Sequence, residues 1–167
     1  MSAGMEAVRE RMAEYLKDRG VDAVTAWPEG ERVSRKRPAA VVSLRECRAG
    51  PAGFQNYLGE RYSEETGLWE ELYGRKAVLI FGLDLYASKG GDGSELQKAF
   101  DVLARALADG GPEGMKVTEF SCGETEYDGA AGVLKRSARA VCQAWLYASV
   151  LPGGLFNDFE LRGGLKQ

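Results

Sequence analysis

The sequence predicts an α+β domain in which helices pack on one face of a mainly antiparallel sheet. Three observations support this. Two segments have the apolar spacing of amphipathic helices, one segment alternates apolar residues strictly, and several short apolar runs are bounded by glycine or proline. The strands are expected in runs rather than alternating with helices, which favours α+β over α/β. The 167 residues suit a single domain over residues 1–150, with an apolar extension over residues 151–167.

Two amphipathic helices are predicted, over residues 4–19 and 95–108. The apolar stripe of the first consists of Met5, Val8, Met12, Tyr15 and Leu16. That of the second consists of Leu96, Phe100, Leu103, Ala104 and Leu107. Gly20 supplies a left-handed stop for the first helix. Ser94 and Gln97 have the spacing of a capping box at the start of the second.

The clearest strand is predicted over residues 75–87, where one face is wholly apolar and the other is mixed. The apolar face consists of Ala77, Leu79, Phe81, Leu83 and Leu85. Such a strand belongs at the centre of a sheet. Residues 67–73 are expected to pair with it, with Gly74 at a bend or tight turn.

The other segments are less regular. Residues 21–27, 39–46 and 117–122 are predicted strands, and residues 123–132 are polar and turn-like. Residues 48–62 contain Gly50, Pro51 and Gly53 and are predicted to form a loop with one helical turn near residues 54–58. Residues 133–150 suit either a helix, by their alanines, or a strand, by their alternation.

Composition excludes several kinds of chemistry. The chain has no histidine, which removes Ser-His-Asp and Cys-His catalysis and imidazole metal ligands. The net charge of −3 provides no general attraction to nucleic acid or anionic lipid. Cys47, Cys122 and Cys142 are widely spaced and lack a CxxC pair, so reduced thiols are expected. The charged N-terminus is unlike a signal peptide and no apolar run is long enough to span a membrane, so a soluble protein is expected.

Three local motifs are candidate sites. The glycine loop of residues 90–93 precedes a helix but lacks the spacing of a phosphate-binding loop, so it is interpreted as a connection. Glu124, Glu126 and Asp128 offer oxygen ligands for a hard cation, but their spacing matches no calcium loop. Cys122 has no histidine to activate it, so an idle thiol is favoured over a nucleophile. No catalytic residue, cofactor site or metal site is predicted.

A basic run and several aromatic residues are candidates for contacts with partners. Four positive charges fall within six residues, at Arg32, Arg35, Lys36 and Arg37, in a segment expected to be exposed and to face a partner. The aromatic residues expected in loops are candidate interface anchors: Phe54, Tyr57 and Trp69.

The order of segments resembles the tail terminator, or tail completion, proteins of long-tailed bacteriophages and phage-derived particles. The resemblance spans roughly residues 3–150. It rests on the first helix, on PAAVVSLREC after the basic run, on LYGRKAVLIFGLDLYASKGGDGSELQKAFDVLARAL, and on CGETEYDGAAGVLKRSARAVCQAWLYA. None of these is a catalytic signature. In the last stretch a turn precedes a final strand in the family, which favours a strand over residues 133–150.

The resemblance implies a structural virion protein without enzymatic activity. Its members assemble as a homo-oligomer, most often a hexameric ring, that caps the tail tube, ends its polymerisation and meets the head-side connector or neck protein. The ring would let DNA pass through its lumen without specific binding. It would lie at the head-proximal end of the tail after assembly in the bacterial cytoplasm, with no cofactor and no membrane contact.

The expected interface consists of Arg32, Arg35, Lys36, Arg37, Trp69, Leu155, Phe156 and Phe159. The last three belong to the apolar extension and are expected to be buried on their own subunit or on a neighbour, since so apolar a tail would not stay in water. The alternative function is a regulatory domain that binds a small molecule or a metal, using the acids of residues 124–128.

Overall fold

The computed structural model describes residues 4–25, 38–51, 57–88, 93–129, 132–151 and 155–162, and only the backbone of residues 51, 128, 146–151 and 155–162. Its helices and strands, in chain order, are α1 (Met5–Asp18), β1 (Ala23–Val24), β2 (Ala39–Pro51), β3 (Tyr57–Ser63), β4 (Leu68–Ser88), α3 (Ser94–Ala108), β5 (Met115–Asp128), β6 (Val133–Leu151) and β7 (Leu155–Arg162).

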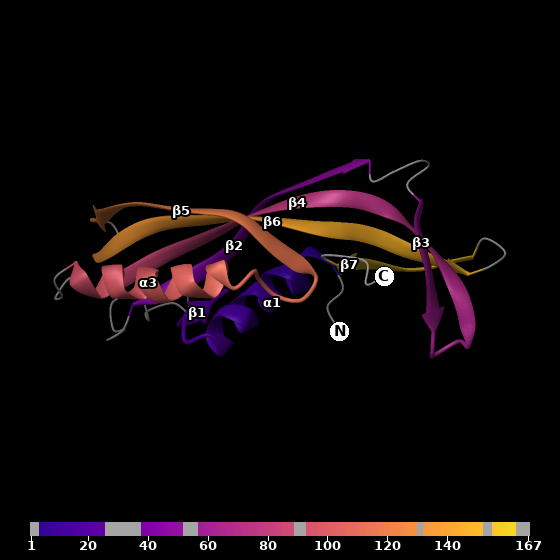
Figure 1. Cartoon of the computed structure of the whole chain (residues 1–167). Helices are drawn as coiled ribbons and strands as arrows, with labels where there is room; N and C mark the ends of the chain where they lie inside the picture. Colours follow the sequence, from indigo (N-terminus) through magenta and orange to yellow (C-terminus); the bar gives the residue numbers. More distant parts are fainter. Residues whose placement is uncertain are drawn as a thin grey trace.

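The strands form one seven-stranded sheet with the order β1-β2-β4-β6-β5, in which β3 also pairs with β4 and β7 with β6. The short pairing of β1 with β2 is parallel and the other pairings are antiparallel. Both helices lie on the same face of this sheet (Figure 1). The predicted α+β class, with helices on one face of a mainly antiparallel sheet, is confirmed.

Two long strands run through the whole sheet. On the outer side of β4, β2 pairs with residues 75–86 and β3 pairs with residues 68–73. On the outer side of β6, β5 pairs with residues 133–144 and β7 pairs with residues 145–151. The 21 residues of β4 correspond to about 70 Å of strand at about 3.3 Å per residue.

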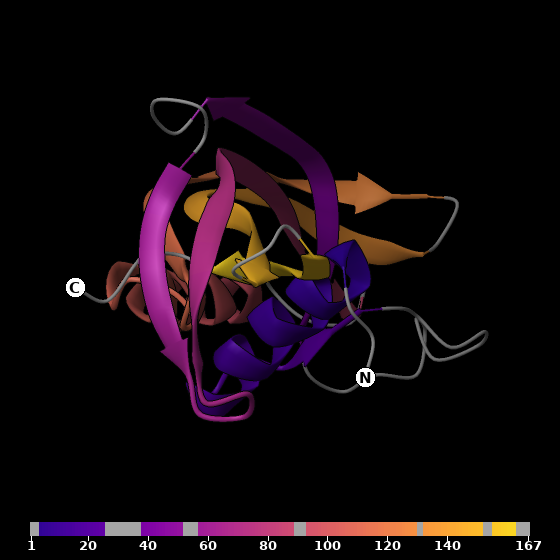
Figure 2. The same ribbon diagram turned by 90° about the vertical axis from the view of Figure 1, so that its right-hand side faces the viewer.

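This pairing divides the sheet into two parts, which we call the body and the arm. The body consists of β1, β2, β5 and the adjoining parts of β4 and β6, and the helices cover it. The arm consists of β3, β7, residues 68–74 of β4 and residues 145–151 of β6. It extends past both helices, and its β3–β4 hairpin turns toward the helix side of the sheet (Figure 1). Figure 2 shows the molecule from the arm end, with this hairpin in front.

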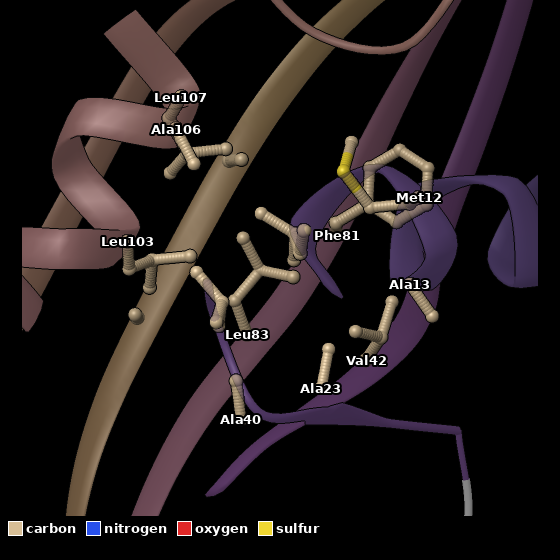
Figure 3. Packing of buried hydrophobic residues seen from close by; sticks show 14 of the residues in the cluster. Met12, Ala13, Ala23, Ala40, Val42, Phe81, Leu83, Leu103, Ala106 and Leu107 are labelled. Atoms are coloured by element: carbon tan, nitrogen blue, oxygen red, sulfur yellow. The ribbon is translucent and has the colours of Figure 1, made fainter. Parts of the chain in front are cut away.

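The core of the body lies between the helices and the sheet (Figure 3). The predicted apolar face of β4 is buried there, since its five residues, Ala77, Leu79, Phe81, Leu83 and Leu85, are at most 1% exposed. Met12 and Leu16 from α1 and Leu96 and Leu103 from α3 have no exposed surface and pack into the same cluster. The two helical stripes and the central position of this strand are therefore confirmed in the main, although Met5, predicted on the first stripe, is 40% exposed.

Tyr15 of α1 forms hydrogen bonds with the end of α3 and the residues that follow it. Its hydroxyl donates to the carbonyl oxygen of Ala106 at 2.7 Å and accepts from the backbone N–H of Gly111 at 3.2 Å. The Arg19 guanidinium lies 3.8 Å from the centre of the same ring. A side chain of the first helix thus holds the end of α3, far along the chain.

The prediction of a hairpin closed at Gly74 is wrong. β4 continues without a break through residues 68–75, and Gly74 pairs with Tyr147 of β6. The turn lies instead at residues 64–67, where Gly67 has φ +69° and donates its N–H to the Ser63 carbonyl at 2.8 Å. A single glycine inside a run of strand-forming residues does not reverse a chain, whereas the polar Glu-Glu-Thr-Gly sequence does.

The predicted loop with a helical turn near residues 54–58 is also wrong where the structure describes it. β2 extends to Pro51, and residues from Tyr57 onward form β3. Gly59 has φ +128° and lies beside a register shift between Tyr57 and Gly59. Such an irregularity hides the strand from a search for strict alternation.

Three further predictions change. Residues 123–128 continue β5 rather than forming a turn. Of the two alternatives left open for residues 133–150, the strand that the resemblance favours is confirmed, as β6. The capping box is wrong, because the residue that caps α3 is Gly93 and Gln97 donates instead to Asp101 at 3.0 Å. The predicted strand of residues 21–27 is reduced to β1, and its last two residues lie outside the described part of the chain.

Asp84 holds β2, β4 and β6 together on the face away from the helices. Its carboxylate lies 2.8 Å from Arg45 Nη2 and 3.8 Å from Lys135 Nζ. β4 and β6 pair at Gly82–Arg139 and again at Leu85–Arg136, but not in between. In this gap the Ala138 N–H donates to Asp84 Oδ1 at 3.3 Å. The carboxylate therefore satisfies a backbone donor within the sheet.

We expect Asp84→Ala to lower the free energy of unfolding by about 1–3 kcal/mol, because the Ala138 N–H loses its acceptor. Asp84→Asn keeps an acceptor oxygen and loses only the ion pairs, so its loss should be smaller. Urea denaturation of both variants measures this difference. Equal stability of the wild type and the alanine variant would contradict the structural role.

Candidate subunit interface

The hairpin of β3 and residues 68–73 of β4 has two different faces. Its register places Tyr62 opposite Trp69, Glu60 opposite Glu71 and, beyond the register shift, Tyr57 opposite Tyr73. We call these six residues the aromatic–acidic face. The next residues along each strand, among them Arg61, Glu70 and Leu72, point to the opposite face.

The aromatic rings of the aromatic–acidic face are open to solvent. Trp69 is 58% exposed, Tyr62 is 53% exposed and Tyr57 is 44% exposed. Tyr62 and Trp69 meet edge to face with ring centroids 5.8 Å apart, and Tyr57 and Tyr73 do so at 5.5 Å. The pairs hold four rings in fixed orientations on one side of the hairpin. Exposed aromatic groups of this kind are typical of contact surfaces.

The opposite face of the hairpin is partly buried. Leu72 is 2% exposed and Glu70 is 5% exposed, whereas Leu68 nearer the turn is 52% exposed. The Glu70 carboxylate accepts a hydrogen bond from Arg61 Nε at 3.2 Å, directly across the two strands, and the Arg61 side chain is 30% exposed. The buried side chains of the hairpin thus lie on this face.

Negative charge is concentrated between the rings. Glu60 and Glu71 face each other across the strands, an arrangement that costs free energy unless a cation is nearby. The Tyr73 hydroxyl donates to Glu71 Oε2 at 2.9 Å, and this bond raises the pKa of Tyr73 above its usual value. The pKa of Tyr57 is raised as well, first by partial desolvation and then by the charges of Glu60 and Glu71. The face therefore favours cations.

The structure places only some of the predicted interface residues. Trp69 lies on the aromatic–acidic face, opposite Tyr62 at the end nearest the turn. Leu155, Phe156 and Phe159 belong to β7, where their backbone pairs with Leu151, Val150 and Ala148 of β6. The apolar extension thus adds a strand to the arm, while the burial of its side chains lies outside what the structure describes. Arg32, Arg35, Lys36 and Arg37 also lie outside the described residues.

Sequence reasoning missed Tyr62, Glu60 and Glu71 as parts of this surface. Tyr57 is a predicted anchor, but its place beside the other rings was not predicted. The signal that could have found them is the pair of short aromatic and acidic stretches, YLGERY and LWEELY, on either side of a polar turn. Reading these as two antiparallel strands brings the rings together.

The acids considered for metal binding do not form a site. Glu124 and Glu126 are exposed on the edge strand β5, and the side chain of Asp128 is outside the described part. Among the described residues, no group of three acids or thiols is arranged to hold a metal ion. The alternation of β5 spreads these residues along a surface instead of gathering them in a loop.

The three cysteines are not activated as nucleophiles. Burial raises the pKa of Cys47 and of Cys122, although Arg136 opposes the effect at Cys122. Burial raises the pKa of Cys142 to about 12. Cys142 has no exposed surface and packs in the core.

We expect Cys142 to remain unmodified when the native protein is treated with a thiol reagent at pH 8. A pKa of about 12 leaves on the order of one thiol in ten thousand deprotonated at this pH. Cys47 and Cys122, which are partly exposed, should react more slowly than a free thiol but faster than Cys142. Peptide mapping of labelled protein measures this order, with urea-unfolded protein as the control in which all three react. Fast labelling of Cys142 in the native state would contradict it.

One cavity of about 410 Å³ lies between α3 and the strands β2 and β4 of the body. Its described lining is mainly aliphatic and includes Val21, Leu85 and Val102. The charged residues in this lining are Asp22, Glu95 and Lys98. The volume is in the range of small-molecule sites.

Comparison with known proteins adds no assignment: no family model matches the chain. No curated protein matches it either. Within the described residues, neither helix is long and apolar enough to cross a membrane.

Proposed function

We propose that this chain is a structural assembly protein of the tail terminator type. Copies of it form a ring, most simply of six subunits, that caps a tail tube, stops its polymerisation and offers a surface to the head-side connector. No cofactor and no enzymatic step take part. DNA passes through the lumen of the ring without specific binding.

The observation that carries this proposal is the division of the sheet into a body and an arm. The body has its own core, so the chain can fold before it assembles. The arm extends past the helices and presents three aromatic residues that are more than 40% exposed. A protein that works alone rarely leaves such a surface to water. The sequence resembles those of tail terminators, and the arrangement of helices and sheet is compatible with that resemblance. The proposal that the assembly is a ring on a tail tube rests on this resemblance.

The edges of the sheet provide further surfaces for joining subunits. Within the described part of the chain, no strand pairs with the outer edges of β3, β5 and β7. Unpaired backbone N–H and C=O groups on such edges bind strands or loops of neighbours. β5 carries two register shifts, which twist its edge and reduce uncontrolled pairing.

The proposal is tested by adding the purified chain to polymerising tube protein from the same particle. We expect tubes of limited length with a ring at one end, seen by electron microscopy, and a free ring of about 109 kDa, six times the 18.2 kDa subunit. Tubes that grow equally long with and without the chain would refute the function.

A second candidate function, binding of a small molecule, is favoured only by the cavity beside α3. Val102→Trp would fill this cavity, since Val102 is part of its lining. A ligand that raises the melting temperature of the wild type but not of this variant would support the candidate. A panel of metabolites that shifts neither protein would remove it.

A further inference from the structure

The arm hairpin and the basic run carry opposite charges of equal size. Residues 57–73 contain five glutamates and one arginine, a net charge of −4. Residues 32–37 contain three arginines and one lysine, a net charge of +4. In the hairpin, Glu70 is buried with Arg61, so the unbalanced charge belongs to Glu60 and Glu71 on the aromatic–acidic face and to Glu64 and Glu65 in the turn.

The aromatic–acidic face suits arginine in particular. Arginine guanidinium groups bind carboxylates through paired hydrogen bonds and stack on the faces of tryptophan and tyrosine. Here four rings alternate with the facing carboxylates of Glu60 and Glu71. A cation placed between these carboxylates would also remove their repulsion.

The described residues on either side of the basic run, Thr25 and Pro38, belong to the body, far along the sheet from this face. Residues 26–37 join Thr25 to Pro38, and Ala39 pairs with Tyr86 near the far end of β4. Tyr73 is thirteen residues from Tyr86, about 43 Å along the strand. Fully extended, Arg32 lies at most about 22 Å from Pro38. Figure 1 shows β1 on the helix side of the body in the left half of the molecule and β3 at its right-hand end.

We propose that the aromatic–acidic face binds the basic run, residues 32–37, of a neighbouring copy of this chain. The basic run is joined to the body at Thr25 and Pro38, whereas the aromatic–acidic face belongs to the arm, so each copy offers one surface to each of two neighbours. Contacts of this head-to-tail kind generate a ring when the rotation between subunits closes. The inference rests on the proposed function for the ring itself and adds the residues that join its subunits.

Two charge-reversed variants test the contact. The arm variant carries Glu60→Lys and Glu71→Lys, and the basic-run variant carries Arg35→Glu and Arg37→Glu. The arm variant changes the net charge of residues 57–73 from −4 to 0, and the basic-run variant changes that of residues 32–37 from +4 to 0. Each therefore removes the attraction between opposite net charges at every subunit contact. In 50 mM salt we expect each variant alone to need at least tenfold more protein than the wild type to form rings, measured by sedimentation and native mass spectrometry. Unchanged circular dichroism and melting temperature confirm that both variants fold.

An equimolar mixture of the two variants is the decisive measurement. The reversed arm of one then meets the reversed basic run of the other, and the two unchanged surfaces meet as in the wild type. We expect the mixture to form alternating rings within about threefold of the wild-type concentration. A contact inside one molecule, or with a different basic protein, would not be restored by mixing, and failure of the mixture to assemble would overturn the proposal.

A matched control is Glu10→Lys with Glu14→Lys, which makes the same charge change at exposed positions of α1. It should assemble within about threefold of the wild type, and equal disruption by this variant would refute the specific role of the arm. Rings that cap tubes despite both reversals would overturn the contact and leave the proposed function standing. If mixing restores ring formation but the rings do not stop tube growth, the subunit contact is supported and the proposed function is refuted.

Discussion

Replacement of Phe81 by alanine is expected to lower the free energy of unfolding by about 3–5 kcal/mol. Phe81 has no exposed surface and lies in the middle of β4, where side chains of α1, β2 and α3 surround it (Figure 3). Alanine would leave a cavity where both helices meet the sheet. Because one small domain has a total stability of about 5–15 kcal/mol, the loss would be a large part of it.

Urea denaturation of the purified variant measures this loss. Phe120→Ala is the matched control, because Phe120 lies on the edge strand β5 and is 38% exposed. Its effect should be clearly smaller than that of Phe81→Ala, since more than a third of the Phe120 surface is already in water. Similar losses for the two variants would mean that the body core is not centred on Phe81.

The sequence was sufficient to predict the two helices and the central strand of the body because their signals are local. The alternation from Ala77 to Leu85 defined a central strand, and the helical stripes defined α1 and most of α3. These patterns repeat over several turns or residue pairs, and burial on one face explains them completely. The grouping of helices on one side of the sheet followed from their order.

The arm was harder to predict because its strands depend on pairing over a distance. β3 contains Gly59 and a register shift, and β4 passes through Gly74 although glycine normally weakens a strand. Pairing of residues 71–74 with β6 keeps the backbone extended there. Periodicity within a short window contains no information about this partner, which is more than seventy residues away.

The interface residues were predicted unevenly for the same reason. Trp69 is notable by residue type alone, whereas Tyr62 joins it only through the register of the hairpin. The burial of Glu70 could not be predicted from a stretch of adjacent acids, because alternation sends Glu70 inward and Glu71 outward. Glu70 accepts a hydrogen bond from Arg61, whereas Glu71 accepts one from Tyr73. Substitution of Glu70 is therefore expected to affect stability, and substitution of Glu71 the contact surface.

Arg61→Met is expected to destabilise the arm by about 1–3 kcal/mol, because it removes the guanidinium 3.2 Å from the Glu70 carboxylate. Glu70 is 5% exposed, so the carboxylate loses a partner where little of its surface meets water. The double variant Arg61→Met and Glu70→Leu removes both charges and should recover most of the loss. Hydrogen exchange of the β3 amides reports the local opening, and urea denaturation reports the global effect.

The pair of Arg48 and Glu46 serves as the matched control, with Nε and Oε1 3.0 Å apart and side chains that are 66% and 49% exposed. Arg48→Met should change stability by less than about 1 kcal/mol, because solvent screens this pair. If Arg61→Met were equally harmless, the Glu70 carboxylate would be hydrated in solution. The Arg61–Glu70 pair would then contribute no more to the stability of the arm than the exposed pair contributes to that of the body.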